Sequence, residues 1–108
     1  MNQEEIIKIQ SLLSPIFEKN KVKQVVLFGS AARRTETRRS DLDLMIIMES
    51  DKRFFDRFDA FNDIFYLLKG KAVDLLIYTP EELKRISYRP FIHSLLKEGQ
   101  LIYEQREK

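Results

Sequence analysis

Residues 29–44 read GSAARRTETRRSDLDL, a stretch that joins a Gly-Ser turn to two aspartates at alternate positions, Asp41 and Asp43. An apolar run rich in β-branched residues precedes it at residues 22–28, and a second apolar run, LMIIM, follows at residues 44–48. Runs of this kind, bounded by turn residues, predict buried strands. The stretch is therefore expected to connect two core strands and to present its polar groups at their ends.

Asp41 and Asp43 are candidate metal ligands. Alternate residues of a strand point to the same face, so the two carboxylates are expected side by side at the mouth of the strand. Like charges so close repel and raise each other's proton affinity unless a cation lies between them, and magnesium prefers such oxygen ligands. The alternative is that both acids simply solvate the end of a strand.

A third acid, Asp74, lies within the apolar run at residues 72–78, which predicts another strand. An unpaired charge in the middle of such a strand is unfavourable, so Asp74 is expected to have a partner. That partner is either a metal ion shared with Asp41 and Asp43 or an arginine from residues 33–39.

Gly29 and Ser30 are candidates for contacting phosphate. Glycine lets the backbone approach a ligand closely, and free amide groups at a helix start favour an anion. A Gly-Ser pair after a strand is also common as a simple turn. Beyond it, four arginines around one glutamate carry positive charge that suits a triphosphate or a solvated loop equally: Arg33, Arg34, Arg38 and Arg39 with Glu36.

Helical patterns surround these strands. Apolar residues recur at three- and four-residue spacing over residues 6–17 and 54–68, which predicts two amphipathic helices. Residues 79–82 hold a capping threonine, a proline and a returning glutamate, which predict a further helix that Pro90 interrupts. Gly99 is expected to end this helical region before a short strand.

This order of elements predicts an α/β or α+β fold, with helices packed on one small mixed sheet. The length of 108 residues suits a single domain over residues 1–108. The absence of cysteine excludes thiolate catalysis and CxxC zinc sites. Without a secretory signal or an apolar run long enough for a bilayer, a soluble cytoplasmic protein with no membrane contact is expected.

Two tempting sites are set aside. His93 is the single histidine, but it lies in the apolar stretch 91–96, where a packed or partly exposed histidine is commoner than a catalytic base. The phenylalanines spaced along residues 54–65 are expected to belong to the core rather than to a base-stacking surface. The net charge of +2 does not by itself indicate nucleic-acid binding.

Residues 29–44 resemble the GSxARG and SDxDL signature of minimal nucleotidyltransferases in the DNA polymerase β superfamily. VDLLIY at residues 73–78 resembles the strand that bears the third acid of that family, and the resemblance extends over nearly the whole chain. One departure is Arg34, which stands where the family commonly has glycine, so the turn is expected to differ there.

The resemblance implies a nucleotidyltransferase fold and transfer of a nucleoside monophosphate, AMP from ATP or the equivalent from another nucleoside triphosphate, to a hydroxyl group. It also implies two magnesium ions, or manganese in their place, and the following site residues: Asp41, Asp43 and Asp74 as catalytic and metal-binding acids, with Gly29, Ser30 and Arg33 at the nucleotide.

The resemblance further implies a protein acceptor, a HEPN-domain partner against which this chain acts as an antitoxin and with which it forms an oligomer. The alternative is a catalytically silent module of the same fold, which neutralises such a partner by binding alone. A nucleic-acid-binding regulator would rest on the arginines of residues 33–39 and is the least favoured reading.

Overall fold

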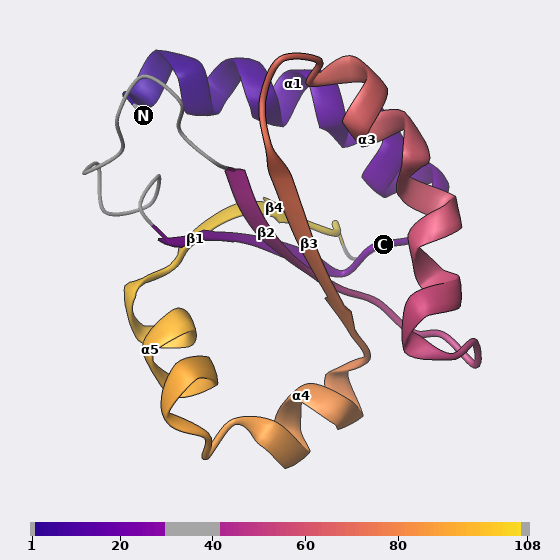
Figure 1. Ribbon diagram of the computed structural model, residues 1–108, viewed down its shortest axis with the longest axis vertical. Coiled ribbons are helices and arrows are strands. Elements are labelled where there is room, and N and C mark those ends of the chain that lie inside the picture. The colour runs from indigo at the N-terminus through magenta and orange to yellow at the C-terminus, as the bar shows by residue number, and fades with distance from the viewer. Residues whose placement is uncertain (1, 30–41, 107–108) are drawn as a thin grey trace.

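The computed structural model describes residues 2–29 and 42–106. A four-stranded mixed sheet forms the middle layer, and helices cover both of its faces (Figure 1). This confirms the mixed α/β class expected from the sequence. The elements in chain order are α1 (Gln3–Lys19), β1 (Gln24–Phe28), β2 (Leu42–Ile47), the 3-10 helix η1 (Phe54–Phe61), α3 (Asn62–Leu67), β3 (Val73–Tyr78), α4 (Pro80–Ile86), α5 (Pro90–Glu98) and β4 (Gln100–Glu104).

The strand order β3-β2-β1-β4 determines which chain segments meet at each end of the sheet. β1 runs antiparallel to both β2 and β4, whereas β2 and β3 are parallel. The end of β1 and the beginnings of β2 and β3 therefore lie at one end of the sheet. The candidate residues named above that fall in these three strands are brought together there.

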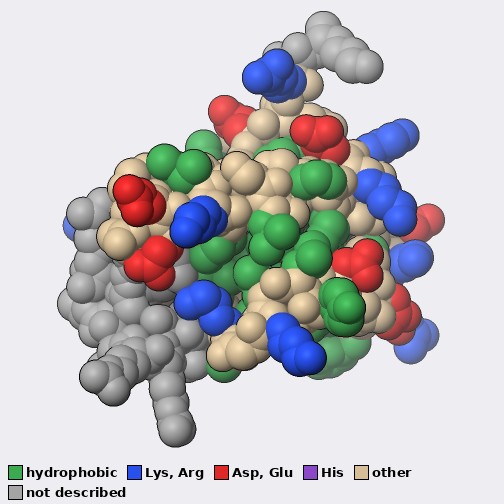
Figure 2. Space-filling view, turned by 90° about the horizontal axis from the view of Figure 1, so that it is seen from above, with side chains coloured by type: hydrophobic (Ala, Val, Ile, Leu, Met, Phe, Trp, Pro, Cys, Tyr) green, Lys and Arg blue, Asp and Glu red, His purple; other side chains and the backbone are tan. Residues whose placement is uncertain are grey.

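The larger core lies between the sheet and the layer of α1, η1 and α3. Helix α1 buries four apolar residues at helical spacing on this face, Ile6, Ile9, Leu13 and Phe17. Asn2 begins the helix with a capping box, since its side chain accepts from the Glu5 N–H at 2.9 Å. Figure 2 looks onto this helical layer, where apolar side chains gather between charged ones.

A smaller core covers the opposite face of the sheet. Val26, Met45 and Ile47 of the strands pack there with Leu95 of α5. In Figure 1, α4 and α5 form the layer below the sheet, opposite α1 and α3. This face is less completely covered, because two short helices are its only helical layer among the described residues.

The region expected as one helix over residues 54–68 is instead two elements, η1 followed by α3. A phenylalanine repeat of four and three residues matches the 3.6-residue period of an α-helix better than the 3.0-residue period of a 3-10 helix, so the 3-10 geometry of η1 departs from what the spacing predicts. Of this stripe, Phe61 is fully buried, whereas Phe65 is 43% exposed and Phe54 and Phe58 are half-buried. The expectation that the whole stripe belongs to the core is therefore wrong.

The helical signals in residues 79–98 are confirmed. The Thr79 hydroxyl accepts from the Glu82 N–H at 3.1 Å, and the Glu82 carboxylate accepts from the Thr79 N–H at 2.9 Å. Pro90 separates α4 from α5 and occupies the first turn of the latter. Within the described part of the chain, no helix has the length and apolar character needed to cross a membrane.

Candidate functional site

Asp43 and Asp74 are neighbours on the parallel strands β2 and β3. The two residues are paired in register, so their side chains point to the same face of the sheet. Adjacent strands lie roughly 4.8 Å apart, which brings the two carboxylates within reach of one ion. Like charges directly opposite each other repel, and a cation held between the two carboxylates would offset this repulsion.

Asp74 differs from its expected environment. It is exposed, as the second residue of β3, which lies at the edge of the sheet. The prediction that it lies in a buried environment is wrong, whereas its expected contact with a metal ion or with an arginine of residues 33–39 stays a prediction. Water can solvate this carboxylate, and neither a metal ion nor an arginine is required to stabilise it in the fold. Asp43, on a central strand, is half-buried.

Gly29 stands at the end of β1, next to Phe28, which is the antiparallel partner of Asp43. Its φ of +74° falls in the left-handed region that favours glycine. A Cβ atom built on Gly29 would overlap the Asp43 carboxylate. The glycine predicted to allow close approach of a ligand thus also allows close approach of the half-buried acid.

Several predicted site residues lie outside the described residues. These are Asp41, Ser30 and Arg33, together with the other arginines of residues 33–39. Among residues 2–29 and 42–106, no group of three histidine, cysteine, aspartate or glutamate side chains is arranged to hold a metal ion. The structure therefore brings together Gly29, Asp43 and Asp74 of the predicted set.

His93 lies exposed on α5, and its backbone N–H donates to the Arg89 carbonyl at 2.8 Å. Its exposure agrees with the expectation of a packed or partly exposed histidine. Among the described residues, no side-chain hydrogen bond or ion pair marks it as part of a site.

Two aromatic residues beside Gly29 escaped the sequence analysis. The rings of Phe28 and Phe91 meet edge to face with centroids 6.0 Å apart, and they line a cavity of about 140 Å³ next to Gly29. Phe91 belongs to α5, whose buried residues are Ile92 and Leu95. The sequence offered one signal for Phe91, namely that it is an apolar residue outside the spacing of the buried face of its short helix.

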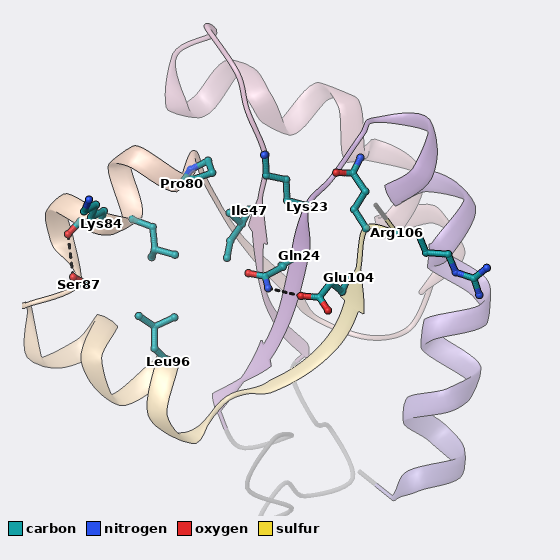
Figure 3. Close-up of a pocket in the computed structure, with 11 residues that line it drawn as sticks. Lys23, Gln24, Ile47, Pro80, Lys84, Ser87, Leu96, Glu104 and Arg106 are labelled. Carbon is teal, nitrogen blue, oxygen red and sulfur yellow. Dashed lines mark hydrogen bonds between the residues drawn. The ribbon is translucent and has the colours of Figure 1, made fainter. Parts of the chain in front are cut away.

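A larger hollow than the cavity beside Gly29 lies elsewhere among the described residues. It measures about 990 Å³ and is found at the other end of the strands, where Gln24 begins β1 and Glu104 ends β4 (Figure 3). Its walls carry Lys23, Lys84 and Arg106, and the Glu104 carboxylate accepts from the Gln24 amide at 2.8 Å. One acid among three basic residues does not provide ligands for a divalent cation, so size does not identify the reactive site here.

The end of the sheet with Asp43 and Asp74 has the chemistry expected for phosphate transfer. Two hard oxygen ligands lie side by side, one exposed and one half-buried, and a glycine lies against the half-buried acid. Two carboxylates on neighbouring strands can bind a cation, and that cation can in turn neutralise the negative charge of phosphate oxygens. The donor set therefore fits divalent metal ions such as magnesium.

Comparison with known proteins agrees with this chemistry. A family model described as Polymerase beta, Nucleotidyltransferase matches residues 11–108. A protein of Methanocaldococcus jannaschii that is provisionally named a protein adenylyltransferase is 35% identical over 109 residues, which cover 95% of this chain and 100% of that protein.

Two solved structures share the fold. One is a toxin–antitoxin crystal structure with AMP-PNP, with a TM-score of 0.64 and 19% identity over 90% of this chain and 74% of that chain. The other is a protein from Sulfolobus solfataricus provisionally named a nucleotidyltransferase, with a TM-score of 0.59 and 22% identity over 94% of this chain and 86% of that chain. At these identities the two structures support the fold alone.

Proposed function

The chain belongs to the polymerase β nucleotidyltransferase family, and on this premise we propose that it transfers AMP from ATP to a hydroxyl group on a partner protein. The observation that carries the proposal is the row formed by Asp43 and Asp74, which are paired in register at the end of the sheet beside Gly29. Asp41, two residues before Asp43, completes the proposed set of acids.

Magnesium or manganese is the proposed cofactor, held by Asp41, Asp43 and Asp74. Two such ions, when bound, would offset negative charge on the entering and leaving oxygens of a displacement at the α-phosphorus. In this reaction the acceptor oxygen forms a bond to the α-phosphorus, the bond to the bridging oxygen breaks, and pyrophosphate leaves.

The two described acids have different proposed tasks. Asp43 is half-buried against Gly29, so its carboxylate is held in place and serves to bind. Asp74 is exposed on the edge strand, where an acceptor can approach, and it serves to take the proton of the attacking hydroxyl. Gly29, Ser30 and Arg33 are proposed to contact the triphosphate.

The nature of the acceptor rests on relatives. The provisional name of the M. jannaschii relative supports a protein acceptor and AMP as the transferred group. The toxin–antitoxin neighbour supports a toxin as that protein, and we propose a HEPN-domain toxin that this chain neutralises as an antitoxin. A chain that binds such a toxin without turnover is the outcome against which the proposal is tested.

The first test is calorimetric titration of the protein with ATP, with Mg²⁺ and then with excess chelator. Binding is expected only with the metal, because the acids repel the triphosphate until a cation intervenes. Asp43→Asn is expected to abolish both binding and transfer, whereas Asp74→Asn is expected to reduce transfer far more than binding.

Thermal unfolding of the same variants separates site from fold. Removing the charge of the exposed Asp74 should leave stability unchanged or raised, because it repels its neighbour Asp43, so melting and activity should diverge in Asp74→Asn. Asp63→Asn, at an exposed acid of α3 on the opposite side of the sheet, is the matched control and should retain full binding. Undiminished ATP binding in chelator, together with normal binding by Asp43→Asn, would contradict the metal-dependent site.

A further inference from the structure

The cavity beside Gly29 adjoins the proposed site but is not explained by it. Its volume is about 140 Å³, and α5 contributes Phe91, Ser94, Leu95 and Glu98 to its lining. This volume is well below the roughly 300 to 1,000 Å³ of pockets that enclose a whole small ligand. The cavity therefore fits one ring system of a larger molecule whose remainder lies outside it.

Phe91 is placed for contact rather than for core packing. Its side chain is 60% exposed, while its neighbours Ile92 and Leu95 supply the buried face of α5. The ring is held from one side by the edge-to-face contact with Phe28. An exposed aromatic ring that is fixed in position can accept another flat ring at little entropic cost.

The position of Phe91 relative to Asp43 and Asp74 indicates which part of a ligand the cavity could hold. Asp74, Asp43 and Phe28 occupy one row across three adjacent strands, on the sheet face that carries α4 and α5. Each step along this row measures roughly 4.8 Å. Phe91 contacts Phe28, the member of this row that is farthest from Asp74, and the two rings line the cavity together. The cavity and the Phe91 ring therefore lie beside the end of the row that is away from Asp74.

Gly99 holds α5 close to the row, because the absence of a side chain at residue 99 allows the end of α5 to lie against β1. A Cβ atom on Gly99 would come within 2.5 Å of Val26 Cγ1 and 2.6 Å of the Leu95 carbonyl oxygen. With φ at −69° the backbone there is ordinary, so the glycine serves close packing and not an unusual conformation.

A nucleotide has the same order of groups as this row, with phosphates at one end, a ribose in the middle and a flat base at the other. From this match we infer that the nucleobase of the bound triphosphate enters the cavity and stacks on Phe91. The inference rests on the proposed function, which assigns the phosphates to the end of the row with Asp43 and Asp74. Phe91 is then a binding residue for the base, and α5 becomes part of the nucleotide site.

The test compares two ligands on each protein variant, ATP and inorganic tripolyphosphate, both with Mg²⁺ in calorimetric titrations. Phe91→Ala is expected to weaken ATP binding about tenfold, as the loss of one base-stacking contact does. Its affinity for tripolyphosphate should not change.

Phe91→Trp keeps a stacking surface and should keep ATP affinity. Tyr88→Ala removes an aromatic residue that is 75% exposed just before α5 and outside the cavity, and should leave both affinities unchanged.

Unchanged ATP affinity in Phe91→Ala would overturn the inference. If that variant also modified a tyrosine acceptor more slowly, the cavity would be assigned to the acceptor instead. Equal weakening of both ligands would also overturn it, because the residue would then act through the fold or the phosphate end. If neither ligand bound to the unmodified protein, the proposed function itself would fail. The titrations alone distinguish unchanged ATP affinity, equal weakening of both ligands and absence of binding.

Discussion

Gly29 shows how one residue can be required for two reasons at once. Its left-handed φ of +74° is strained for any residue with a side chain, and the space that a Cβ would fill holds the Asp43 carboxylate. The second reason ties the turn to the chemistry, because a side chain at residue 29 must move the acid.

Gly29→Ala is therefore expected to lose stability and nucleotide binding together. The backbone strain should lower the free energy of unfolding by about 1 to 2 kcal/mol. Displacement of Asp43 should in addition abolish measurable Mg²⁺-dependent ATP binding in calorimetry.

Gly70→Ala is the matched control for this substitution. Gly70 also has a positive φ, of +95°, but no atom lies within 4 Å of a Cβ built on it. It should lose similar stability in urea unfolding while binding ATP normally. Equal loss of binding in both variants would show that strain, and not the displaced carboxylate, is responsible.

At the scale of elements, one ion pair fastens η1 to α4 and to the end of β3. The Arg57 guanidinium donates to both Glu82 carboxylate oxygens, at 2.6 and 2.9 Å, and to the Ile77 carbonyl at 3.0 Å. Its Nε donates to the Lys52 carbonyl at 3.0 Å. The Arg57 side chain is buried and the Glu82 carboxylate is partly exposed, and the pair fixes how η1 packs on the sheet.

Hydrogen bonds from Arg57, assisted by the Thr79 N–H, lower the pKa of Glu82 from 4.5 to about 2. A lowered pKa means that the unfolded chain binds more protons than the folded one between these two values. The contribution of Glu82 to stability is thus complete above pH 4.5 and is lost as the pH falls toward about 2.

Glu82→Gln should accordingly lower the free energy of unfolding by about 2 kcal/mol at neutral pH, less than for a fully buried pair because the carboxylate is partly exposed. The deficit relative to the unmodified protein should shrink as the pH is lowered from 4.5 toward 2. Urea unfolding of both proteins across this range measures it. Glu81→Gln, at the exposed neighbouring glutamate, is the control and should show little deficit at any pH. A deficit for Glu82→Gln that stays constant with pH would show that the charge of the Glu82 carboxylate is not its cause.

The elements differ in how far sequence could predict them. Helix α1, the capping box at Thr79 and the break at Pro90 were predictable because each has a local cause. The 3-10 geometry of η1 was not predicted by the spacing of its phenylalanines, and the contacts of Arg57 in η1 with Ile77 and Glu82 are tertiary contacts with no local signature. Likewise, Asp74 was expected to be buried, because an apolar sequence does not reveal that β3 is an edge strand.

The candidate site was predictable where acids at alternate strand positions coincided with the signature of the nucleotidyltransferase family. The sequence identified Asp43, Asp74 and Gly29, which the sheet brings together. It did not identify Phe91, because the link between α5 and the end of β1 is a tertiary contact with no local signature. The roles of Asp41, Ser30 and Arg33 remain predictions from the sequence.

At the scale of the whole molecule, the described residues build a single sheet and the helices on its two faces. Asp43 and Asp74 lie side by side at one end of that sheet, and Asp74 is exposed on the edge strand β3. The acceptor hydroxyl is therefore expected to come from another molecule, a tyrosine, serine or threonine of the proposed toxin partner.

Positioning of two reactants contributes about 7 to 11 kcal/mol to a bimolecular reaction, so turnover of ATP by the protein alone is expected to be very slow. Incubation with α-labelled ATP and Mg²⁺, with and without a co-purified HEPN partner, measures this dependence. Label is expected on the partner protein, and it should be absent with Asp74→Asn but present with Asp63→Asn, since Asp63 lies on α3 across the sheet from the site. If the protein alone labelled RNA ends efficiently, the acceptor would be nucleic acid. If the partner were bound and silenced without acquiring label, the chain would neutralise it by binding alone, and the exposed position of Asp74 would have no catalytic meaning.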